Sequence, residues 1–520
     1  MKATSFAAVL FSLTPLITMA PVLAEDDSST KANRYDVSQH RRAIAIDHQV
    51  VTEHKTKVDG QRFDYTATVG TQPVWNNNGD AIATLSYTYY TRNDIKDLGK
   101  RPLMISFNGG PGSASVWMDI GYTGPRAINV DDEGYPLQPY GVKANPYSIL
   151  DVADIVYVNP VNTGYSRVLP DEDGKMPDKD KQKELFFGVN ADIKYLAEWL
   201  NTFVSRNERW RSPKYLIGES YGTTRVSGLA LELQNRQWMY LNGVVLVSPT
   251  DLGIERNGPV KAANRLPYFA AAAWYHKVLP EHLQQIDLEE LLPQVEAFTI
   301  NQYIPALAKG GFIDPSQKQQ IAEQVATYSG LSVDAVIKSN LDISTWYFWK
   351  ELLREKGLTI GRLDSRYLGI DKDGVGDSPD YNAELTSWLH SFTPAINAYL
   401  REELNYHTDI KYQMLGDVHP WDRTDNNTGE NLRQAMAQNP YLNVMIQAGY
   451  YDGGTNYFDA KYSMWQLDPS GKMADRLSYK GYRSGHMMYL RAEDLKQSNQ
   501  DLRDFIQATL PQPNQPAKYE

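Results

Sequence analysis

The 520-residue chain contains no cysteine. Disulfide bonds, thiolate nucleophiles and cysteine-ligated metals are therefore excluded. Long apolar runs are also scarce, because after the first 24 residues no segment is long and apolar enough to cross a bilayer. Histidine occurs only nine times, which leaves few candidates for a catalytic base at neutral pH.

Two common ligand-binding motifs are missing as well. The chain has no His-Glu-x-x-His pattern for zinc, and its Gly-rich segment 108–112 lacks the Gly-Lys-Ser/Thr of a phosphate loop. The acidic stretch 371–377 is similar to a calcium loop in composition only, since Val375 occupies a ligand position and Asn382 replaces the bidentate glutamate. We expect a solvated acidic loop there, and a protein that uses no metal and no cofactor.

The charge balance is acidic, with a formal net charge of −11 at pH 7. An acidic surface repels phosphate backbones, which disfavours a nucleic acid as partner. Apolar residues make up 42% of the chain, as in a globular protein. A length of 520 residues predicts a large domain with an insertion, or two domains.

The N-terminus has the pattern of a secretory signal peptide. Lys2 is followed by the mostly apolar run 6–19, and Val22 and Ala24 place small residues at the positions that a signal peptidase inspects. We expect a signal peptide over residues 1–24, periplasmic or secreted localisation, and no stable membrane insertion after cleavage. The mature chain would carry −12, because residues 1–24 hold one lysine and no acidic residue. An uncleaved membrane anchor is the alternative.

The rest of the chain predicts an α/β fold. Alternating runs over 63–69 and 83–91 indicate antiparallel strands, and short apolar runs at 103–107, 155–158, 215–217, 243–247 and 442–446 indicate buried strands that alternate with helices. This pattern is typical of a mostly parallel sheet with helices on both faces. Residues 251–398 lack strand patterns, so we expect a helical cap insertion there, with the core formed by residues 25–250 and 399–520.

A candidate nucleophile lies in Gly218-Glu219-Ser220-Tyr221-Gly222, which fits the Gly-x-Ser-x-Gly elbow. The segment follows the strand at 215–217 and precedes a helix start, which is the context that the elbow needs. The strained turn raises the serine hydroxyl out of the sheet, and the flanking glycines remove side chains that would clash there.

A serine nucleophile needs a base and an acid that orients the base. His486 is the only histidine near the C-terminus after the last core strand, and the other eight are interpreted as surface or packing residues. Asp452 lies in a Gly-rich loop just after the strand at 442–446, so the order is Ser, Asp, His, as in α/β-hydrolases. Asp459 and Asp468 are the competing acids, although neither follows a strand end.

Oxyanion donors are expected from two places. The turn at 108–112 exposes backbone N–H groups beside the sheet edge, and the N–H of Tyr221 follows the nucleophile.

Taken together, these residues resemble the serine carboxypeptidase family of the α/β-hydrolase superfamily, and its bacterial branch more than the disulfide-bearing vacuolar and plant enzymes. The resemblance spans residues 108–488 and is carried by five blocks in family order: Asn108 to Ser115, Asn159 to Ser166, Gly218 to Gly222, the Asp452 loop, and Gly485 to Met487. It implies removal of single residues from peptide C-termini. It further implies that Asn108 and Glu219 bind the substrate carboxylate and that Gly110 and Tyr221 form the oxyanion hole.

Three positions depart from the family pattern. Asn159 and Asn162 replace the aspartate and the glycine of the second block, and Tyr122 stands where eukaryotic members have a second carboxylate-binding glutamate. We expect Tyr122 to donate a hydrogen bond to the substrate carboxylate, and therefore a peptide KM that varies less with pH than in relatives with two glutamates. An esterase or acyltransferase on the same triad, or a secreted binding protein with a relic site, remain the alternatives.

Overall fold

The structure of the protein is a computed structural model that describes residues 42–512 and 514–519. The predicted signal peptide over residues 1–24 therefore lies outside the described residues. Among the residues that are described, no helix is both long enough and apolar enough to cross a membrane.

A ten-stranded sheet forms the centre of the fold, with the order β1-β2-β3-β7-β4-β9-β10-β13-β14 and with β8 paired to β3. The pairs from β1 to β7 are antiparallel, and those from β7 to β14 are parallel. This arrangement confirms the predicted α/β class with a mostly parallel sheet. The strands are β1 (His48–Val58), β2 (Gln61–Trp75), β3 (Ala81–Arg92), β4 (Leu103–Phe107), β7 (Asp154–Val158), β8 (Arg167–Val168), β9 (Lys214–Glu219), β10 (Gly243–Val247), β13 (Asn443–Gly449) and β14 (Leu477–Tyr482).

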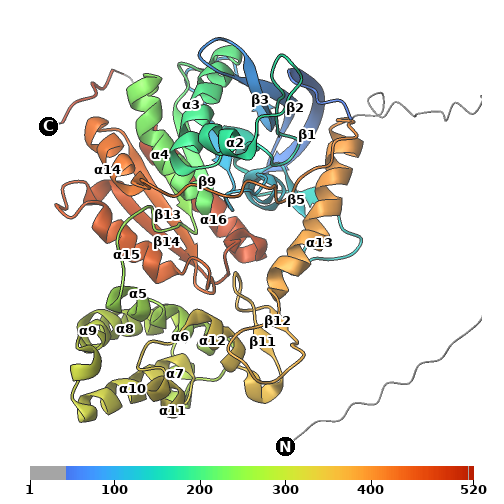
Figure 1. The fold of residues 1–520 in the computed structure, drawn as a ribbon. Helices are drawn as coiled ribbons and strands as arrows, with labels where there is room; N and C mark the ends of the chain where they lie inside the picture. Colours follow the sequence, from blue (N-terminus) through green and yellow to red (C-terminus); the bar gives the residue numbers. More distant parts are fainter. Residues whose placement is uncertain (1–41, 513, 520) are drawn as a thin grey trace, which may run out of the picture. The chain divides into compact units, whose positions relative to one another are not determined.

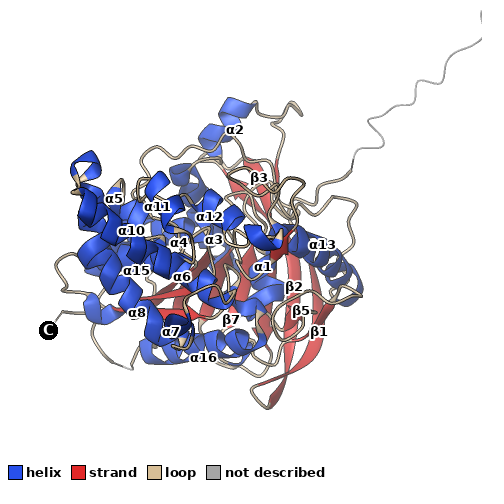
Figure 2. Ribbon diagram, turned by 90° about the horizontal axis from the view of Figure 1, so that it is seen from below, coloured by secondary structure: helices blue, strands red, loops and turns tan. Residues whose placement is uncertain are grey.

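Both faces of the sheet are covered by helices, which Figure 2 shows as blue ribbons on either side of the red strands. Successive side chains of a strand point to opposite faces. In β9, Leu216 packs in the core cluster that contains α3 and α4, whereas Tyr215 and Ile217 pack in the cluster that contains α13 and α16. Burial on both sides explains why the parallel strands are continuously apolar. The helices of this part are α1 (Val116–Met118), α2 (Lys179–Leu185), α3 (Val189–Arg206), α4 (Tyr221–Arg236), α13 (Ala383–Ala398), α14 (Thr428–Gln438), α15 (Tyr457–Leu467) and α16 (Ala492–Thr509).

The helices between β10 and β11 form a group of their own, coloured olive to yellow in Figure 1. Their apolar side chains make a third core cluster, whose members run from Ala263 to Ile360. They are α5 (Pro259–Ala263), α6 (Leu266–Tyr275), α7 (Glu281–Gln284), α8 (Leu288–Phe298), α9 (Ile304–Ala308), α10 (Pro315–Ser329), α11 (Val333–Lys338) and α12 (Thr345–Glu351). Two small sheets complete the fold: β5 (Arg126–Ile128) with β6 (Val142–Ala144), and β11 (Thr359–Ile360) with β12 (Leu368–Gly369).

The C-terminal boundary of the helical insertion differs from the sequence prediction. α13 falls inside the predicted cap over 251–398, but its residues Trp388 and Phe392 belong to the core cluster of the sheet. The ring of Phe392 lies 4.6 Å from that of Trp117, centroid to centroid. The apolar spacing of a helix predicts that one face is buried and does not say against which partner.

Asp119 is an acidic side chain buried in the core. It opens the π-helix Asp119–Thr123, is 3% exposed, and accepts a hydrogen bond from the Tyr90 hydroxyl at 3.0 Å. Burial raises the pKa of Asp119 to about 7, and the hydrogen bonds from Tyr90 and Thr88 offset only part of that rise. The carboxyl is therefore more easily protonated in the folded chain than in the unfolded chain.

This shift predicts a pH-dependent stability. Because the folded pKa lies above the unfolded one, the contribution of Asp119 is complete below about pH 4 and is lost as pH rises to about 7. The loss amounts to at most about 4 kcal/mol at about 1.4 kcal/mol per pKa unit. Asp119→Asn should remove this component, so that the variant gains stability relative to the parent between pH 5 and pH 8. Urea unfolding at both pH values measures the gain, and equal pH dependence of variant and parent would contradict it.

Candidate active site

Ser220 lies in a sharp turn between β9 and α4. Its backbone has φ 58° and ψ −126°, a left-handed conformation that non-glycine residues rarely adopt. The Ser220 N–H donates to the Val247 carbonyl at 2.9 Å, which ties the turn to the end of β10. The side chain is partly exposed at the carboxyl edge of the parallel strands. This is the geometry of a nucleophile elbow.

The two glycines that flank the elbow have no space for a side chain. A Cβ at Gly218 would lie 2.2 Å from the Gly222 carbonyl oxygen, and a Cβ at Gly222 would lie 2.7 Å from the Phe107 oxygen. Both separations are below van der Waals contact, and both neighbours are backbone atoms. The Gly-x-Ser-x-Gly spacing is therefore a steric requirement of the turn.

Asp452 and His486 lie in direct contact. The His486 ring atom Nδ1 is 2.6 Å from Asp452 Oδ2, and both side chains are buried. Asp452 follows the end of β13, and His486 follows β14, the next strand in the sheet. A Cβ at Gly449 would lie 2.1 Å from the Gly485 oxygen, so the two loops approach each other closely through glycine.

Thr455 completes the environment of Asp452. Its hydroxyl donates to Asp452 Oδ2 at 2.7 Å, and the N–H groups of Gly454 and Thr455 donate to Oδ1 at 2.8 and 3.1 Å. These donors hold the carboxyl group in one orientation. No sequence motif singled out Thr455, although its position three residues after the acid is a local signal.

His486 is held so that one ring nitrogen remains available. Burial lowers the pKa of His486, but the Asp452 charge and hydrogen bond, with Glu219, outweigh it, and the net shift is upward. Nδ1 faces Asp452, which leaves Nε2 for a nucleophile. The structure records no hydrogen bond between Ser220 and His486 in the part of the chain that it describes, and such bonds are often long before substrate binds. Both residues bond to the end of β10, because the Ser220 N–H donates to the Val247 carbonyl and Ser248 Oγ donates to the His486 carbonyl at 2.8 Å.

The competing acids lie in other surroundings. Asp459 accepts from Asn264 at 3.1 Å and from Asn456 at 2.6 Å. Asp468 accepts from Ser470 Oγ and from the Met473 N–H, both at 2.6 Å. Neither carboxylate contacts the His486 ring among the contacts of the described residues.

The predicted oxyanion donors come from two neighbouring backbone segments. Gly110 is exposed and has φ 101°, a conformation that suits glycine. A Cβ at Gly109 would lie 2.4 Å from the Tyr221 nitrogen, so the Gly-rich turn passes directly beside the first residue of α4. Within residues 42–512, neither the Gly110 N–H nor the Tyr221 N–H donates to a protein carbonyl. Both are free to donate to a substrate oxygen.

Arg225 holds the Gly-rich turn in place, although no motif in the sequence indicated this role. This buried side chain donates to the Asn108 carbonyl at 2.6 Å and to the Pro111 carbonyl. Its Nε also binds Asp192 Oδ2 of α3 at 2.6 Å. Five donors on a rigid plane let one guanidinium hold a turn and a helix together. The only sequence signal is an arginine on the buried face of α4.

Asn108 and Glu219 are brought together beside Ser220. Asn108 Nδ2 donates to Glu219 Oε1 at 3.0 Å, and Asn108 Oδ1 accepts from the Met118 N–H at 3.0 Å. Asn108 is 1% and Glu219 3% exposed. Burial raises the pKa of Glu219 to about 7, against the opposing effects of His486 and of hydrogen bonds from Tyr489 and Asn108.

The predicted role of Tyr122 requires a correction. Tyr122 is fully buried, and its hydroxyl donates to Gln447 Oε1 at 2.8 Å, so it is not available to a substrate. The phenol that reaches Glu219 belongs to Tyr489, which donates to Oε2. The rings of Tyr122 and Tyr489 stack at 4.7 Å with an interplanar angle of 8°. Tyr122 therefore packs against the ring of Tyr489 and does not contact Glu219. The π-helix that contains Tyr122 directs its hydroxyl toward Gln447 in β13.

The helical insertion contributes one segment to the site. The Leu363 carbonyl accepts from the His486 N–H at 2.7 Å, and the Arg362 carbonyl accepts from the Gly453 N–H at 2.9 Å. Ser365 donates through both its N–H and its hydroxyl to the Tyr451 carbonyl, at 3.0 and 2.9 Å. The segment 362–365 thus binds the acid loop and the histidine loop at once.

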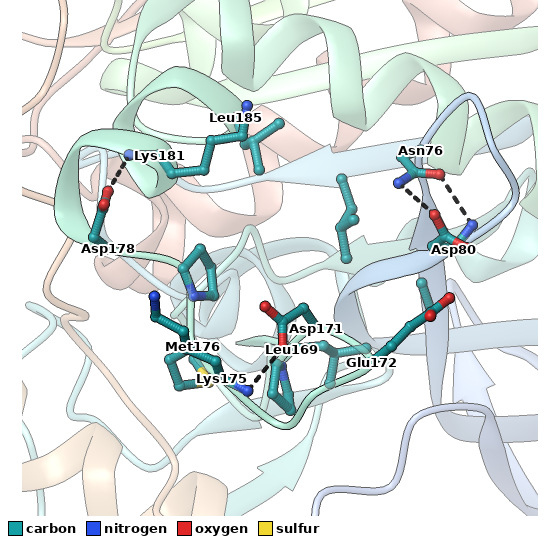
Figure 3. Close-up of a pocket in the computed structure, with 14 residues that line it drawn as sticks. Asn76, Asp80, Leu169, Asp171, Glu172, Lys175, Met176, Asp178, Lys181 and Leu185 are labelled. Atoms are coloured by element: carbon teal, nitrogen blue, oxygen red, sulfur yellow. Dashed lines mark hydrogen bonds between the residues drawn. The ribbon is translucent and has the colours of Figure 1, made fainter.

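A cavity of about 660 Å³ lies elsewhere, between the β2–β3 turn and residues 169–185 (Figure 3). None of the predicted site residues lines it. Its polar side chains bind their own loops: Asp171 accepts from the Lys175 N–H at 2.8 Å and Asp178 from the Lys181 N–H at 2.9 Å. We assign it no catalytic role.

The chain is similar to known serine carboxypeptidases. The family model described as serine carboxypeptidase matches residues 80–480. Serine carboxypeptidase-like 36 of Arabidopsis thaliana is 29% identical over 31% of this chain and 31% of its own length. The retinoid-inducible serine carboxypeptidase of Homo sapiens is 31% identical over 28% of each chain. The matched segments thus span about a third of these curated relatives.

The fold has a counterpart among solved structures. The crystal structure of Kex1(delta)p, a prohormone-processing carboxypeptidase from Saccharomyces cerevisiae, superposes with a TM-score of 0.50. The match covers 86% of this chain and 92% of that chain at 15% sequence identity. At this identity the likeness shows the α/β-hydrolase fold alone.

Proposed function

Because this chain belongs to the serine carboxypeptidase family, we propose that it is an exported serine hydrolase that removes C-terminal residues from peptides. The observation that carries this proposal is the buried contact between His486 Nδ1 and Asp452 Oδ2, at the edge of the sheet where Ser220 forms its elbow. No metal or cofactor is part of the proposed reaction.

The proposed chemistry proceeds through an acyl-enzyme. The Ser220 hydroxyl attacks the last peptide carbonyl while His486 Nε2 takes its proton, and Asp452 stabilises the imidazolium that forms. The N–H groups of Gly110 and Tyr221 hold the oxyanion of the tetrahedral intermediate. The intermediate collapses, the C–N bond breaks, and His486 gives the proton to the leaving amine. Water then attacks the ester, again with His486 as base, and regenerates Ser220.

Recognition of a free C-terminus is proposed for Asn108 and Glu219. Glu219 immediately precedes the nucleophile, so a group bound there lies within one residue of the scissile bond. With a pKa of about 7, Glu219 holds a proton at acidic pH and can donate it in a hydrogen bond to a carboxylate. Once ionised, it repels that carboxylate. The proposed site therefore prefers acidic to neutral pH for peptides with a free C-terminus.

The test is mass spectrometry of a peptide mixture incubated with the mature protein. We expect C-terminal ladders from peptides with a free carboxylate and little cleavage of the same peptides as C-terminal amides. Internal cuts would contradict the exopeptidase assignment. Hydrolysis of esters or acyl transfer without any ladder would favour the esterase or acyltransferase alternative. A fluorophosphonate probe that fails to label Ser220 would identify a relic binding protein.

Glu219→Ala should weaken binding of a free C-terminus selectively. At pH 5 we expect peptide KM to rise roughly 10- to 100-fold, since a hydrogen bond to a charged group contributes about 1.5–3 kcal/mol. KM for an ester with a blocked C-terminus should change less than about threefold, because that substrate offers no carboxylate. Steady-state kinetics on both substrates measure the two effects. A parallel rise in both KM values would place Glu219 outside the carboxylate site.

Export is proposed on the pattern of residues 1–24, with a periplasmic or extracellular location. Peptides are the proposed partners, and the acidic charge speaks against nucleic acid.

A further inference from the structure

The Glu219 carboxyl group accepts hydrogen bonds from two side chains, one at each of its oxygens. Asn108 Nδ2 donates to Oε1, and the Tyr489 hydroxyl donates to Oε2. All three side chains are buried. No salt bridge to Glu219 occurs among the described residues, and the charged groups that act on it are His486 and Asp452 of the triad. Its environment therefore contains two fixed donors and no second carboxyl group in contact.

Packing against neighbouring residues fixes the position of the Tyr489 ring. It lies in the short helical turn Met488–Leu490, three residues after His486. Its ring stacks on Tyr122, and a Cβ at Gly121 would lie 2.8 Å from Tyr489 Cε2. Gly121 thus leaves the space that the ring fills.

The stacking partner is itself anchored. The Tyr122 hydroxyl donates to Gln447 Oε1, and Gln447 Nε2 donates to the Tyr482 hydroxyl at 2.9 Å. The support of Tyr489 therefore extends through the π-helix to β13 and β14, the strands that precede the two triad loops.

A phenol differs from a second acid in what it does to Glu219. Burial raises the pKa of Tyr489 well above its ordinary value, and Glu219 raises it further. Tyr489 therefore keeps its proton at every pH at which the enzyme works, and it acts as a permanent donor to Glu219. A second carboxyl group would instead share a proton with Glu219 and bring a second charge.

We propose that Tyr489 is a positioning residue, which holds the Glu219 carboxyl toward the free C-terminus of the substrate and makes this a site with one titrating carboxyl group. The proposal rests on the proposed function, because it assumes that Glu219 contacts the substrate carboxylate. Tyr489 thereby takes a donor role near the place where the sequence pattern predicted that Tyr122 would act.

The sign of the effect follows from the hydrogen bond. Tyr489 donates to Glu219 and stabilises its ionised form. Without that donor Glu219 should retain its proton to higher pH, and binding of a free C-terminus should persist to higher pH. Loss of one hydrogen bond to a charged group corresponds to a shift of about one to two pH units.

The experiment measures peptide binding to full-length mature protein in the Ser220→Ala background, so that no turnover occurs. The ratio of the Kd values of a peptide and its C-terminal amide is followed from pH 5 to pH 9, which cancels effects of His486 common to both ligands. When the logarithm of this Kd ratio is plotted against pH, we expect a single transition, or step, with a limiting slope of one. Tyr489→Phe should move the step up by about one pH unit. Tyr215→Phe, a control that removes a buried phenol hydroxyl bonded to Thr509 and not to this cluster, should leave the step in place.

An unmoved step in a folded Tyr489→Phe protein would overturn the proposal and leave a structural role only. A slope of two in the parent would also overturn it, by revealing a second titrating acid, and this reading does not depend on the variant folding. Glu219→Gln should abolish the step. If the step persists in Glu219→Gln, the carboxylate role in the proposed function fails instead.

Discussion

Ser220→Ala is expected to abolish hydrolysis of peptides and esters while the fold remains intact. Loss of such a nucleophile lowers kcat by about 10⁶. The fold should survive because the Ser220 contact that closes the elbow is made by its backbone N–H to Val247, which alanine keeps. Alanine also removes the Ser220 hydroxyl oxygen, which is the atom proposed to attack the substrate carbonyl.

A matched control lies on the same helix. Ser227 is buried in α4, and its hydroxyl has no hydrogen-bond partner among the described residues. Ser227→Ala therefore removes a hydroxyl of the same kind without touching the elbow, and its activity should stay within about twofold of the parent. Labelling by a fluorophosphonate should disappear in Ser220→Ala and persist in Ser227→Ala. Activity of Ser220→Ala within about tenfold of the parent would refute the assignment of the nucleophile.

Asp452→Asn is expected to slow the chemical step by about 10⁴ with little change in substrate binding. The asparagine oxygen can still accept from the Gly454 and Thr455 N–H groups, so the loop should keep its shape. Its amide, however, would turn a donor toward His486 Nδ1. The ring would then carry its proton on Nε2 and could not accept the serine proton.

The same substitution has a consequence for the pH profile. Asp452 raises the pKa of His486 through its charge and its hydrogen bond. Without that charge the pKa of His486 falls, so the acidic limb of kcat/KM should move to lower pH. A full pH–rate profile on an ester substrate measures both the loss and the shift.

Asp459→Asn and Asp468→Asn are the controls for this choice of acid. Both carboxylates bind groups of their own loops or of a neighbouring helix and stand apart from the histidine ring. Each variant should keep at least about a third of the parental kcat. A loss of about 10⁴-fold in either one, with Asp452→Asn nearly active, would transfer the orienting role to that residue.

The parts of the site that could be expected from the sequence are those set by local chain geometry. The glycines at 218 and 222 mark a turn that no side chain could occupy, and the strand before them and the helix after them give the turn its direction. The acid and the histidine follow the ends of two parallel strands that are neighbours in the sheet. Loops after adjacent parallel strands meet at one edge, so the order of strands along the chain is enough to pair Asp452 with His486.

Other features depended on packing between distant segments. The sequence has a tyrosine at 122 where a donor was expected, but a π-helix turns that hydroxyl toward Gln447, and its stacked partner Tyr489 supplies the donor instead. The pairing of Arg225 with Asp192 shows no local signal, because a buried ion pair is recognised only when α3 and α4 are seen side by side. α13 likewise has an apolar face whose partner only the fold identifies.

The sequence by itself therefore determined the fold class, the elbow and the order of the three candidate triad residues, because these follow from periodicity, from glycine sterics and from the edge at which parallel strands end. The tertiary structure alone decided which tyrosine reaches Glu219, what braces the Gly-rich turn and where the helical insertion stops. Those contacts join residues far apart in the chain, and side-chain direction across such distances is set by packing, which no local pattern encodes.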